Sequence, residues 1–210
     1  MDATNTLSKH GRLIVIEGVN GVGKTTQVRL AKLKLAKMGF TVTTFKFPDE
    51  ASTIGDLINR VMLMKQTLSD EVLLTLFAAN RLEHKQQIEE ALLAGHLVLC
   101  DRYSESEYAY GSALGLPNDW LLNLESRMPV ADLVLLLDLE PTIARQRVVM
   151  AGRSDQFETD EKILEAARAE YIALYQNPPN PHQKWTRIDA SQPIDVVLDE
   201  VIRQISILTA

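Results

Sequence analysis

The sequence has little cysteine, no long apolar run and no excess of positive charge. Cys100 is the one cysteine among 210 residues, so no disulfide can form within the chain, as expected of a cytoplasmic protein. No run of about 18 apolar residues occurs, so we expect neither a transmembrane helix nor a membrane partner. The formal net charge is −6. The chain therefore lacks the overall positive field that attracts nucleic acid.

Composition and length favour one globular domain. Apolar residues make up 46% of the chain and charged residues 24%, which is ordinary for such a domain. Residues 1–11 are polar and carry no secretory signal, so we expect a flexible tail followed by a single domain over 12–210. The histidines are scattered, at positions 10, 84, 96 and 182. Together with one cysteine they form no zinc-binding spacing.

Short apolar runs alternate with longer segments of helical period, the pattern of β-α-β units around a parallel sheet. The expected strands are residues 12–17, 41–47, 96–101, 132–139 and 185–189. The segments of helical period are residues 25–38, 70–94, 159–175 and 193–208. Two of the strands are apolar on both faces, which is typical of strands buried between layers of helices. The pattern predicts an α/β fold.

The stretch EGVNGVGKTT, residues 17–26, follows the first strand and precedes the first helix. It fits the phosphate-loop motif G-x-x-x-x-G-K-[ST] in the required context. Glycines let the backbone amides turn toward phosphate oxygens, and the helix N-terminus adds partial positive charge. Lys24 is expected to neutralise the β- and γ-phosphates of ATP, and the Thr25 hydroxyl to bind Mg²⁺. The expected nucleotide contacts are Gly18, Asn20, Gly21, Val22, Gly23, Lys24, Thr25 and Thr26.

A phosphate loop is shared by kinases, GTPases and ATP-driven machines, so other residues must identify the reaction. The DxxG and NKxD stretches of a small GTPase are absent. Instead, Asp101 and Arg102 follow a buried strand at its carboxyl end, where open α/β sheets bind ligands. Asp101 can hold Mg²⁺ through water, and Arg102 can clamp a phosphate with two hydrogen bonds. This position favours a functional role over a surface ion pair.

From about residue 11 to the C-terminus, the sequence resembles the thymidylate kinase (dTMP kinase) family of P-loop nucleoside monophosphate kinases. Besides the two motifs above, the blocks that carry the resemblance are FKFP (45–48), LLTLFAANRLEH (73–84), ADLVLLLDLEP (131–141) and IDASQPIDVV (188–197). The first two of these separate the family from other nucleoside monophosphate kinases. The resemblance implies a three-layer αβα P-loop NTPase fold with a five-stranded parallel sheet. It also implies a homodimer that transfers the ATP γ-phosphoryl group to dTMP with Mg²⁺.

The resemblance also implies roles for residues of the acceptor site. Phe77 would stack on the thymine ring, and Arg81 would reach the edge of the base. Arg102 would hold the acceptor phosphate, while Ser106 and Tyr110 would line the nucleoside pocket, with Tyr110 crowding the 2′ position. Without the neighbouring family residues, Phe77 would be interpreted as core packing. Arg81 is harder to explain that way, because arginine is almost never buried without a partner.

The sequence departs from the family at the acceptor phosphate. Asp49 and Glu50 stand where many members carry an arginine that touches this phosphate, so either Lys46 substitutes or Arg102 holds it alone. In the phosphate loop, Asn20 replaces the usual acidic residue that contacts the sugar 3′-hydroxyl. Its amide can still form that hydrogen bond.

Gly21 stands where one branch of the family has a catalytic arginine, and the other branch supplies that arginine from a mobile lid. We expect the lid over residues 144–158. Arg153 is our candidate, because Gly152 and the polar residues after it indicate a segment able to close. Gln156 stands where the lid arginine is common.

Two further arginines precede this candidate in the lid. Arg147 is expected near the adenine, together with the loop at 190–192 that contains Gln192. For Arg145 we expect a solvated helix face.

Other interpretations stay open. A broader nucleoside monophosphate kinase would use the same site. A deoxynucleoside kinase would need a base near the acceptor hydroxyl, which Asp49 or Glu50 could supply. A catalytically weak ATP-binding module is the third alternative, and the combination of Lys24, Asp101 and Arg102 argues against it.

Overall fold

The computed structural model describes residues 10–63, 66–150, 152 and 161–210. Its sheet contains five parallel strands in the order β2-β3-β1-β4-β5. The strands are β1 (Arg12–Glu17), β2 (Val42–Lys46), β3 (Leu97–Asp101), β4 (Leu133–Asp138) and β5 (Lys184–Asp189). Every expected strand is present, with ends that differ by no more than one residue. The fold class predicted from the sequence is confirmed.

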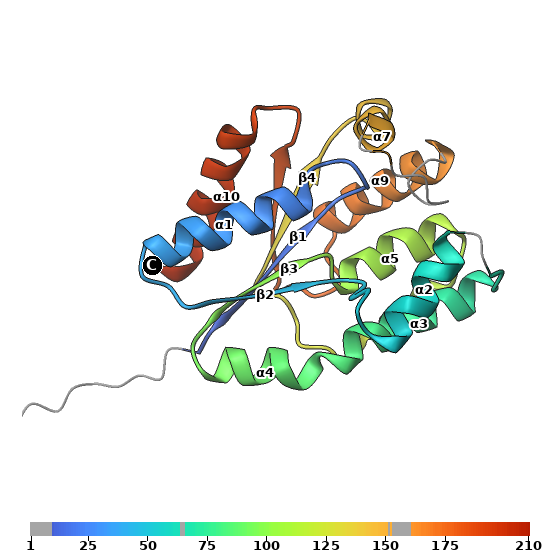
Figure 1. Cartoon of the computed structure of the whole chain (residues 1–210), viewed down its shortest axis with the longest axis horizontal. Coiled ribbons are helices and arrows are strands. Elements are labelled where there is room, and N and C mark those ends of the chain that lie inside the picture. Colours follow the sequence, from blue (N-terminus) through green and yellow to red (C-terminus); the bar gives the residue numbers. More distant parts are fainter. Residues whose placement is uncertain (1–9, 64–65, 151, 153–160) are drawn as a thin grey trace, which may run out of the picture.

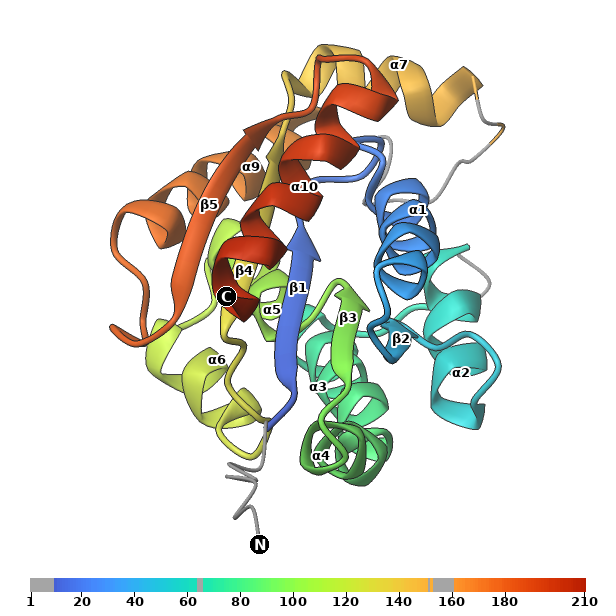
Figure 2. The ribbon, with the colours of Figure 1, turned by 90° about the vertical axis from the view of Figure 1, so that its left-hand side faces the viewer.

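Helices cover both faces of this sheet. Their bounds are α1 (Lys24–Lys37), α2 (Thr53–Met62), α3 (Asp70–Glu83), α4 (Lys85–Leu93), α5 (Ser104–Ala113), α6 (Asn118–Glu125), α7 (Pro141–Met150), α9 (Glu161–Gln176) and α10 (Ile194–Thr209). Helices α1 and α10 pack together above the sheet, and α4 lies below it (Figure 1). Seen from the side, α10 lies in front of the sheet and α9 behind it (Figure 2). No described helix is long and apolar enough to cross a membrane.

The strands are buried on both faces because their side chains alternate between two layers of helices. On β1, Ile14 and Ile16 belong to the core cluster that contains residues of α1 and α10. Leu13 and Val15 point the other way, into the cluster that contains residues of α4. This explains why the central strands are continuously apolar in the sequence.

The helical segment expected over residues 70–94 is two helices, α3 and α4, that meet at His84. The His84 ring packs against the rings of Phe45 and Phe47, with centroids 5.9 and 5.7 Å apart. These contacts come from β2 and the residue after it, far away in sequence. Tertiary packing therefore accompanies a break that the helical period does not show.

Helix α5 could not be recognised by periodicity. Its sequence, SESEYAYGSA, is rich in polar residues, yet Glu105, Ser106 and Glu107 are buried. Polar residues therefore occupy buried positions of the helix, and the usual amphipathic pattern is missing from the sequence.

Candidate active site

The carboxyl ends of three neighbouring strands carry the candidate site. Ile16 pairs with Asp101, and Asp101 pairs with Lys46, so β1, β3 and β2 end at the same level. The phosphate loop leaves β1 there, and the acceptor loop, which we define as residues 47–52, leaves β2. Because parallel strands share one carboxyl edge, segments far apart in sequence meet at a single cavity.

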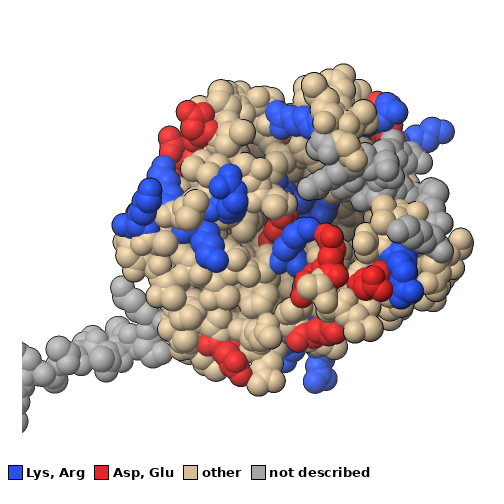
Figure 3. Space-filling model, viewed as in Figure 1, with Lys and Arg blue, Asp and Glu red and all other residues tan. Residues whose placement is uncertain are grey.

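This cavity has a volume of about 390 Å³, which suits a nucleotide-sized ligand. Its lining brings together most of the residues singled out in the sequence. They are Asn20, Gly21, Gly23, Lys24, Thr25, Thr26, Lys46, Phe77, Arg81, Asp101, Arg102, Ser106, Tyr110 and Arg147. Gly18, Val22 and Gln192 are outside this lining. Figure 3 shows basic and acidic side chains close together around a hollow in this face.

The phosphate loop has three glycines with positive φ, at positions 18, 21 and 23, and two of them are also closely packed. Gly18 and Gly21 have φ of 135° and 85°, which L side chains rarely adopt. A Cβ at Gly18 would lie 2.3 Å from the Leu137 carbonyl oxygen, and one at Gly21 2.2 Å from that of Ala144. The loop is therefore packed against β4 and α7 as well as being turned sharply.

Lys24 and Thr25 begin α1 at the end of the loop. Lys24 Nζ donates hydrogen bonds of 2.9 Å to the carbonyl oxygens of Gly18 and Val19, so the lysine lies across the loop. The Thr25 hydroxyl donates to Asp101 Oδ2 at 2.5 Å. A hydroxyl and a carboxylate oxygen placed side by side are hard oxygen donors of the kind that Mg²⁺ prefers. The predicted pairing of Thr25 with Asp101 is thus present in the geometry.

Arg102 has a backbone conformation that is unusual for its residue type. Its φ is 68°, the one positive value at a non-glycine among the described residues. Such strained residues cluster at functional sites, where surrounding contacts enforce them. Its guanidinium donates to Asn20 Oδ1 and to the Ser106 hydroxyl, and it lies 5.4 Å from the Tyr110 ring centroid. The arginine is thereby held between the phosphate loop and α5.

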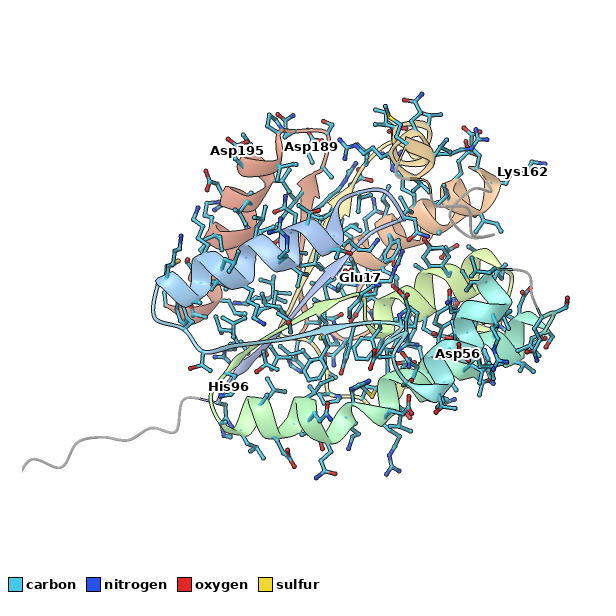
Figure 4. All side chains as sticks on the ribbon, viewed as in Figure 1. Glu17, Asp56, His96, Lys162, Asp189 and Asp195 are labelled. Carbon is cyan, nitrogen blue, oxygen red and sulfur yellow. The ribbon has the colours of Figure 1, made fainter. Side chains whose placement is uncertain are left out.

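Glu17, the last residue of β1, anchors this arrangement (Figure 4). Its carboxylate accepts hydrogen bonds from the backbone N–H groups of Tyr103 and Ser106, and from the Ser106 hydroxyl. The hydroxyl of Tyr171 on α9 donates to Glu17 Oε2 at 2.7 Å. The buried carboxylate is thus satisfied by three residues, two at the start of α5 and one on α9, and in return it positions Ser106 and Tyr171.

The far end of the cavity is formed by α3 and α5. Phe77 and Arg81 lie four residues apart on α3, and Glu107 and Tyr110 lie three apart on α5, so each pair shares a helix face. All four residues line the cavity. An aromatic ring, a guanidinium and a carboxylate are therefore available to a flat heterocycle.

Arg81 is buried between two carboxylates. Its Nη2 donates to Glu125 Oε1 at 2.7 Å and to Glu107, and its Nε donates to both oxygens of Glu125. Burial raises the pKa of Glu107 to about 7, although the charge of Arg81 opposes this shift. The expectation that a buried Arg81 must have partners is met by acids on α5 and α6.

Lys46 and Glu50 form an ion pair of 2.6 Å at the acceptor end of the cavity. The acceptor loop that carries Glu50 is held by Asn80, which is buried on α3. Asn80 Oδ1 accepts from the Asp49 backbone N–H at 2.7 Å, and its Nδ2 donates to the Ser52 hydroxyl at 2.9 Å. The lysine proposed as a substitute phosphate ligand is thus already engaged by an acid of the same loop.

The sequence matches the family model described as Thymidylate kinase over residues 16–201. The chain belongs to the thymidylate kinase family. Membership confirms the resemblance and the expected enzyme class, and the shared fold accounts for the cavity at the carboxyl edge of the sheet.

Individual thymidylate kinases are similar over nearly the whole chain. The enzyme of Plasmodium falciparum is 32% identical over 94% of this chain and 91% of its own length. That of Schizosaccharomyces pombe is 33% identical over 93% of this chain and 92% of its own length. A solved thymidylate kinase from Candida albicans, described as having broad substrate specificity, superposes with a TM-score of 0.82 and 28% identity. That match covers 95% of this chain and 93% of the solved one.

The lid expected over residues 144–158 begins within α7, and the structure describes it only up to Met150 and at Gly152. Arg147 on α7 donates to the Ala190 carbonyl oxygen at 3.2 Å, which brings it to the predicted adenine loop. Arg145 is exposed, 3.8 Å from Glu161, consistent with a solvated position. Gln192 is exposed and bonds Asp189. Arg153 and Gln156 lie outside the described residues.

Sequence reasoning missed several residues that shape this site in a thymidylate kinase fold. Glu17 offered one signal, an acid that closes an otherwise apolar strand. Tyr171, Glu107 and Glu125 offered none, because polar or aromatic residues on helices are ordinarily exposed or part of the core. Their roles depend on contacts that only the fold creates.

Proposed function

We propose that the chain transfers the γ-phosphoryl group of ATP to dTMP in the presence of Mg²⁺, giving dTDP and ADP. One observation carries this proposal: a single cavity joins the phosphate loop with Phe77 and Arg81. A donor triphosphate and a flat acceptor base thus have adjoining sites, with Arg102 between them.

On the donor side, the phosphate-loop amides and Lys24 bind the β- and γ-phosphates, and Arg147 and Gln192 approach the adenine. Thr25 and Asp101 fit Mg²⁺, because their oxygens are neighbours at the end of the loop. When bound, Mg²⁺ supplies positive charge that neutralises the phosphates.

On the acceptor side, Phe77 stacks on the thymine, and Arg81 bonds the edge of the base. Ser106 and Tyr110 line the deoxyribose, and Asn20 reaches its 3′-hydroxyl. Asn20, Ser106 and Tyr110 each contact the Arg102 guanidinium, which supports a common position for sugar and phosphate. Arg102 binds the acceptor phosphate, and Lys46 assists it.

The acceptor oxygen requires no strong base, because a phosphate monoester has its second pKa near 6 and is largely ionised at neutral pH. The barrier is the repulsion between two anionic phosphates. Lys24 and Arg102 lower that repulsion by placing positive charge beside both groups, and positioning does the rest.

The test is to incubate the purified chain with MgATP and, separately, dTMP, dUMP, dGMP, UMP, AMP and thymidine, and to follow ADP release. We expect rapid release with dTMP and none when Mg²⁺ is chelated. Release with thymidine but not with dTMP would show a deoxynucleoside kinase instead, and silence with every acceptor would show an ATP-binding module.

We further propose that Arg153 is the lid arginine that approaches the transferring phosphoryl group. Arg153→Ala should lower kcat by about 100-fold or more, by analogy with other arginines that neutralise this transition state. Arg145→Ala is the matched control, since Arg145 is an exposed arginine of the same segment. Equal kcat for both variants would refute the assignment.

We also propose that the protein acts as a cytoplasmic homodimer. Val72 and Leu82 on α3, and Leu122 on the adjacent α6, are exposed apolar residues, which supports a contact there. Sedimentation equilibrium should give twice the mass of the chain, and Leu82→Asp should shift it toward the mass of one chain. Ile207→Asp, at an exposed apolar residue of α10, should leave it unchanged.

A further inference from the structure

Glu107 has a buried carboxylate oxygen that faces no partner. The residue is 2% exposed, and it lines the cavity at the end formed by α3 and α5. One oxygen, Oε2, accepts from Arg81 Nη2, whereas Oε1 makes no hydrogen bond. Buried polar atoms are nearly always hydrogen-bonded, and an unpaired one is costly. An acceptor of this kind at a ligand cavity points to a donor on the ligand.

Arg81 presents the opposite chemistry beside it. Its Nε and Nη2 are occupied by Glu125 and Glu107, while Nη1 makes no hydrogen bond to the described residues. Arg81 also lines the cavity. The direct contact between the two side chains therefore places available N–H donors and an available carboxylate acceptor next to each other.

The edges of the bases differ in their match to this pair. Thymine, uracil and guanine carry a carbonyl next to a ring N–H, which is a lactam edge of one acceptor and one donor. Cytosine and adenine carry an exocyclic amino group next to a bare ring nitrogen, which is the reverse order. Against Arg81 and Glu107, the amino group would meet N–H donors and the ring nitrogen would meet a carboxylate.

We propose that Glu107 is a specificity-determining residue that accepts the ring N–H of the acceptor base while Arg81 donates to the adjacent carbonyl. The site then selects 2′-deoxynucleoside monophosphates by their lactam edge. It takes thymine and, as a second acceptor class, 6-oxopurines, and it rejects bases with the reversed edge. This inference rests on the proposed function, because it concerns the same acceptor site.

The first experiment uses the unmodified chain and bases of equal size. We expect kcat/KM for dTMP to exceed that for 5-methyl-dCMP by at least about 100-fold, since a site built to bond one edge rejects the other strongly. We expect dGMP to be phosphorylated at least about tenfold better than dAMP. Use of 5-methyl-dCMP within tenfold of dTMP would overturn the assignment of the edge, and no turnover of dGMP would overturn the second acceptor class.

The second experiment compares Glu107→Gln with Glu105→Gln. Glu105 is the matched control, a buried acid two residues earlier on α5 that lines a different cavity. In Glu107→Gln, the amide oxygen stays on Arg81 and the NH₂ faces the base, so kcat/KM for dTMP should fall about 10- to 100-fold. That for 5-methyl-dCMP should not fall, because the NH₂ can donate to its bare ring nitrogen, and the KM for ATP should change less than twofold. Glu105→Gln should leave the dTMP to 5-methyl-dCMP ratio unchanged.

A structural role alone would produce a different result. If Glu107→Gln lowers kcat/KM equally for both nucleotides, or Glu105→Gln alters the ratio as much, the proposal is wrong. Should Glu107→Gln fail to fold, the unmodified chain still tests selection of the lactam edge by the pair, and use of 5-methyl-dCMP within tenfold of dTMP overturns it. Failure of the proposed function would give a different result, because no ADP would then be formed from MgATP in the presence of dTMP.

Discussion

Glu50→Gln should improve acceptor binding, because Glu50 occupies the lysine that an acceptor phosphate would use. Lys46 and Glu50 are 2.6 Å apart, with side chains 53% and 55% exposed. Exposed ion pairs of this kind are worth about 0 to 1 kcal/mol. Freeing Lys46 therefore gains at most about a factor of five in affinity. We expect KM for dTMP to fall two- to fivefold, with kcat changed less than twofold.

The assay is steady-state ADP release with saturating MgATP and varied dTMP, at low and at high salt. The gain should shrink at high salt, where exposed charges are screened. Combining the change with Lys46→Met tests the cause, because Glu50→Gln then has no lysine to release. Glu89→Gln is the control, since Lys85 and Glu89 form a similar pair of 2.9 Å on α4, outside the cavity.

An unchanged or higher KM would refute the competition between Glu50 and the phosphate. A fall in kcat of tenfold or more would contradict the reasoning in another way. It would give Glu50 the role of a base, which phosphorylation of a 5′-hydroxyl requires, and thymidine should then be a substrate.

Three further predictions concern the phosphate loop and the buried carboxylates. Gly21→Ala should abolish most ADP release and lower the urea midpoint, because its Cβ would lie 2.2 Å from a carbonyl oxygen. Gly39→Ala is the control, since Gly39 has φ of 91° and no atom within 4 Å of the added Cβ. It should lower the free energy of unfolding by about 1 kcal/mol and leave activity unchanged. Burial, and then the charge of Glu17, raise the pKa of Glu105 to about 8, so the folded chain keeps a proton that the unfolded chain loses. The free energy of unfolding of the unmodified chain, relative to that of Glu105→Gln, should therefore decline from pH 5 to 8. The loss should reach about 3 kcal/mol at pH 7, measured by urea titrations at each pH. Tyr171→Phe should cost about 1.5 to 3 kcal/mol in the same titration, because Glu17 loses a buried donor, and identical midpoints would show that water replaces it.

The phosphate loop and the strand ends could be located from the sequence because their signals are local. Gly18, Gly23, Lys24 and Thr25 form a motif within a few positions, and the loop fits between a strand and a helix. Asp101 was assigned correctly to the end of a strand, since an apolar run that stops at an acid marks that point without knowledge of any partner.

The acceptor end was less accessible to such reasoning. Phe77 and Arg81 were named through family resemblance, and their own sequence context did not distinguish a base site from a core. Glu107 was not named at all. Its significance depends on Arg81, 26 residues away in sequence, and on the free oxygen that this contact leaves in the cavity.

The sequence by itself determined that this chain is an α/β phosphate-binding protein, because backbone periodicity and glycine spacing are properties of neighbouring residues. The tertiary structure decided how the buried charges are arranged. Glu17 meets Tyr171 across 154 positions, and Arg81 meets Glu125 across 44. Buried carboxylates must find partners in three dimensions, and no periodicity along the chain records which partner each one finds.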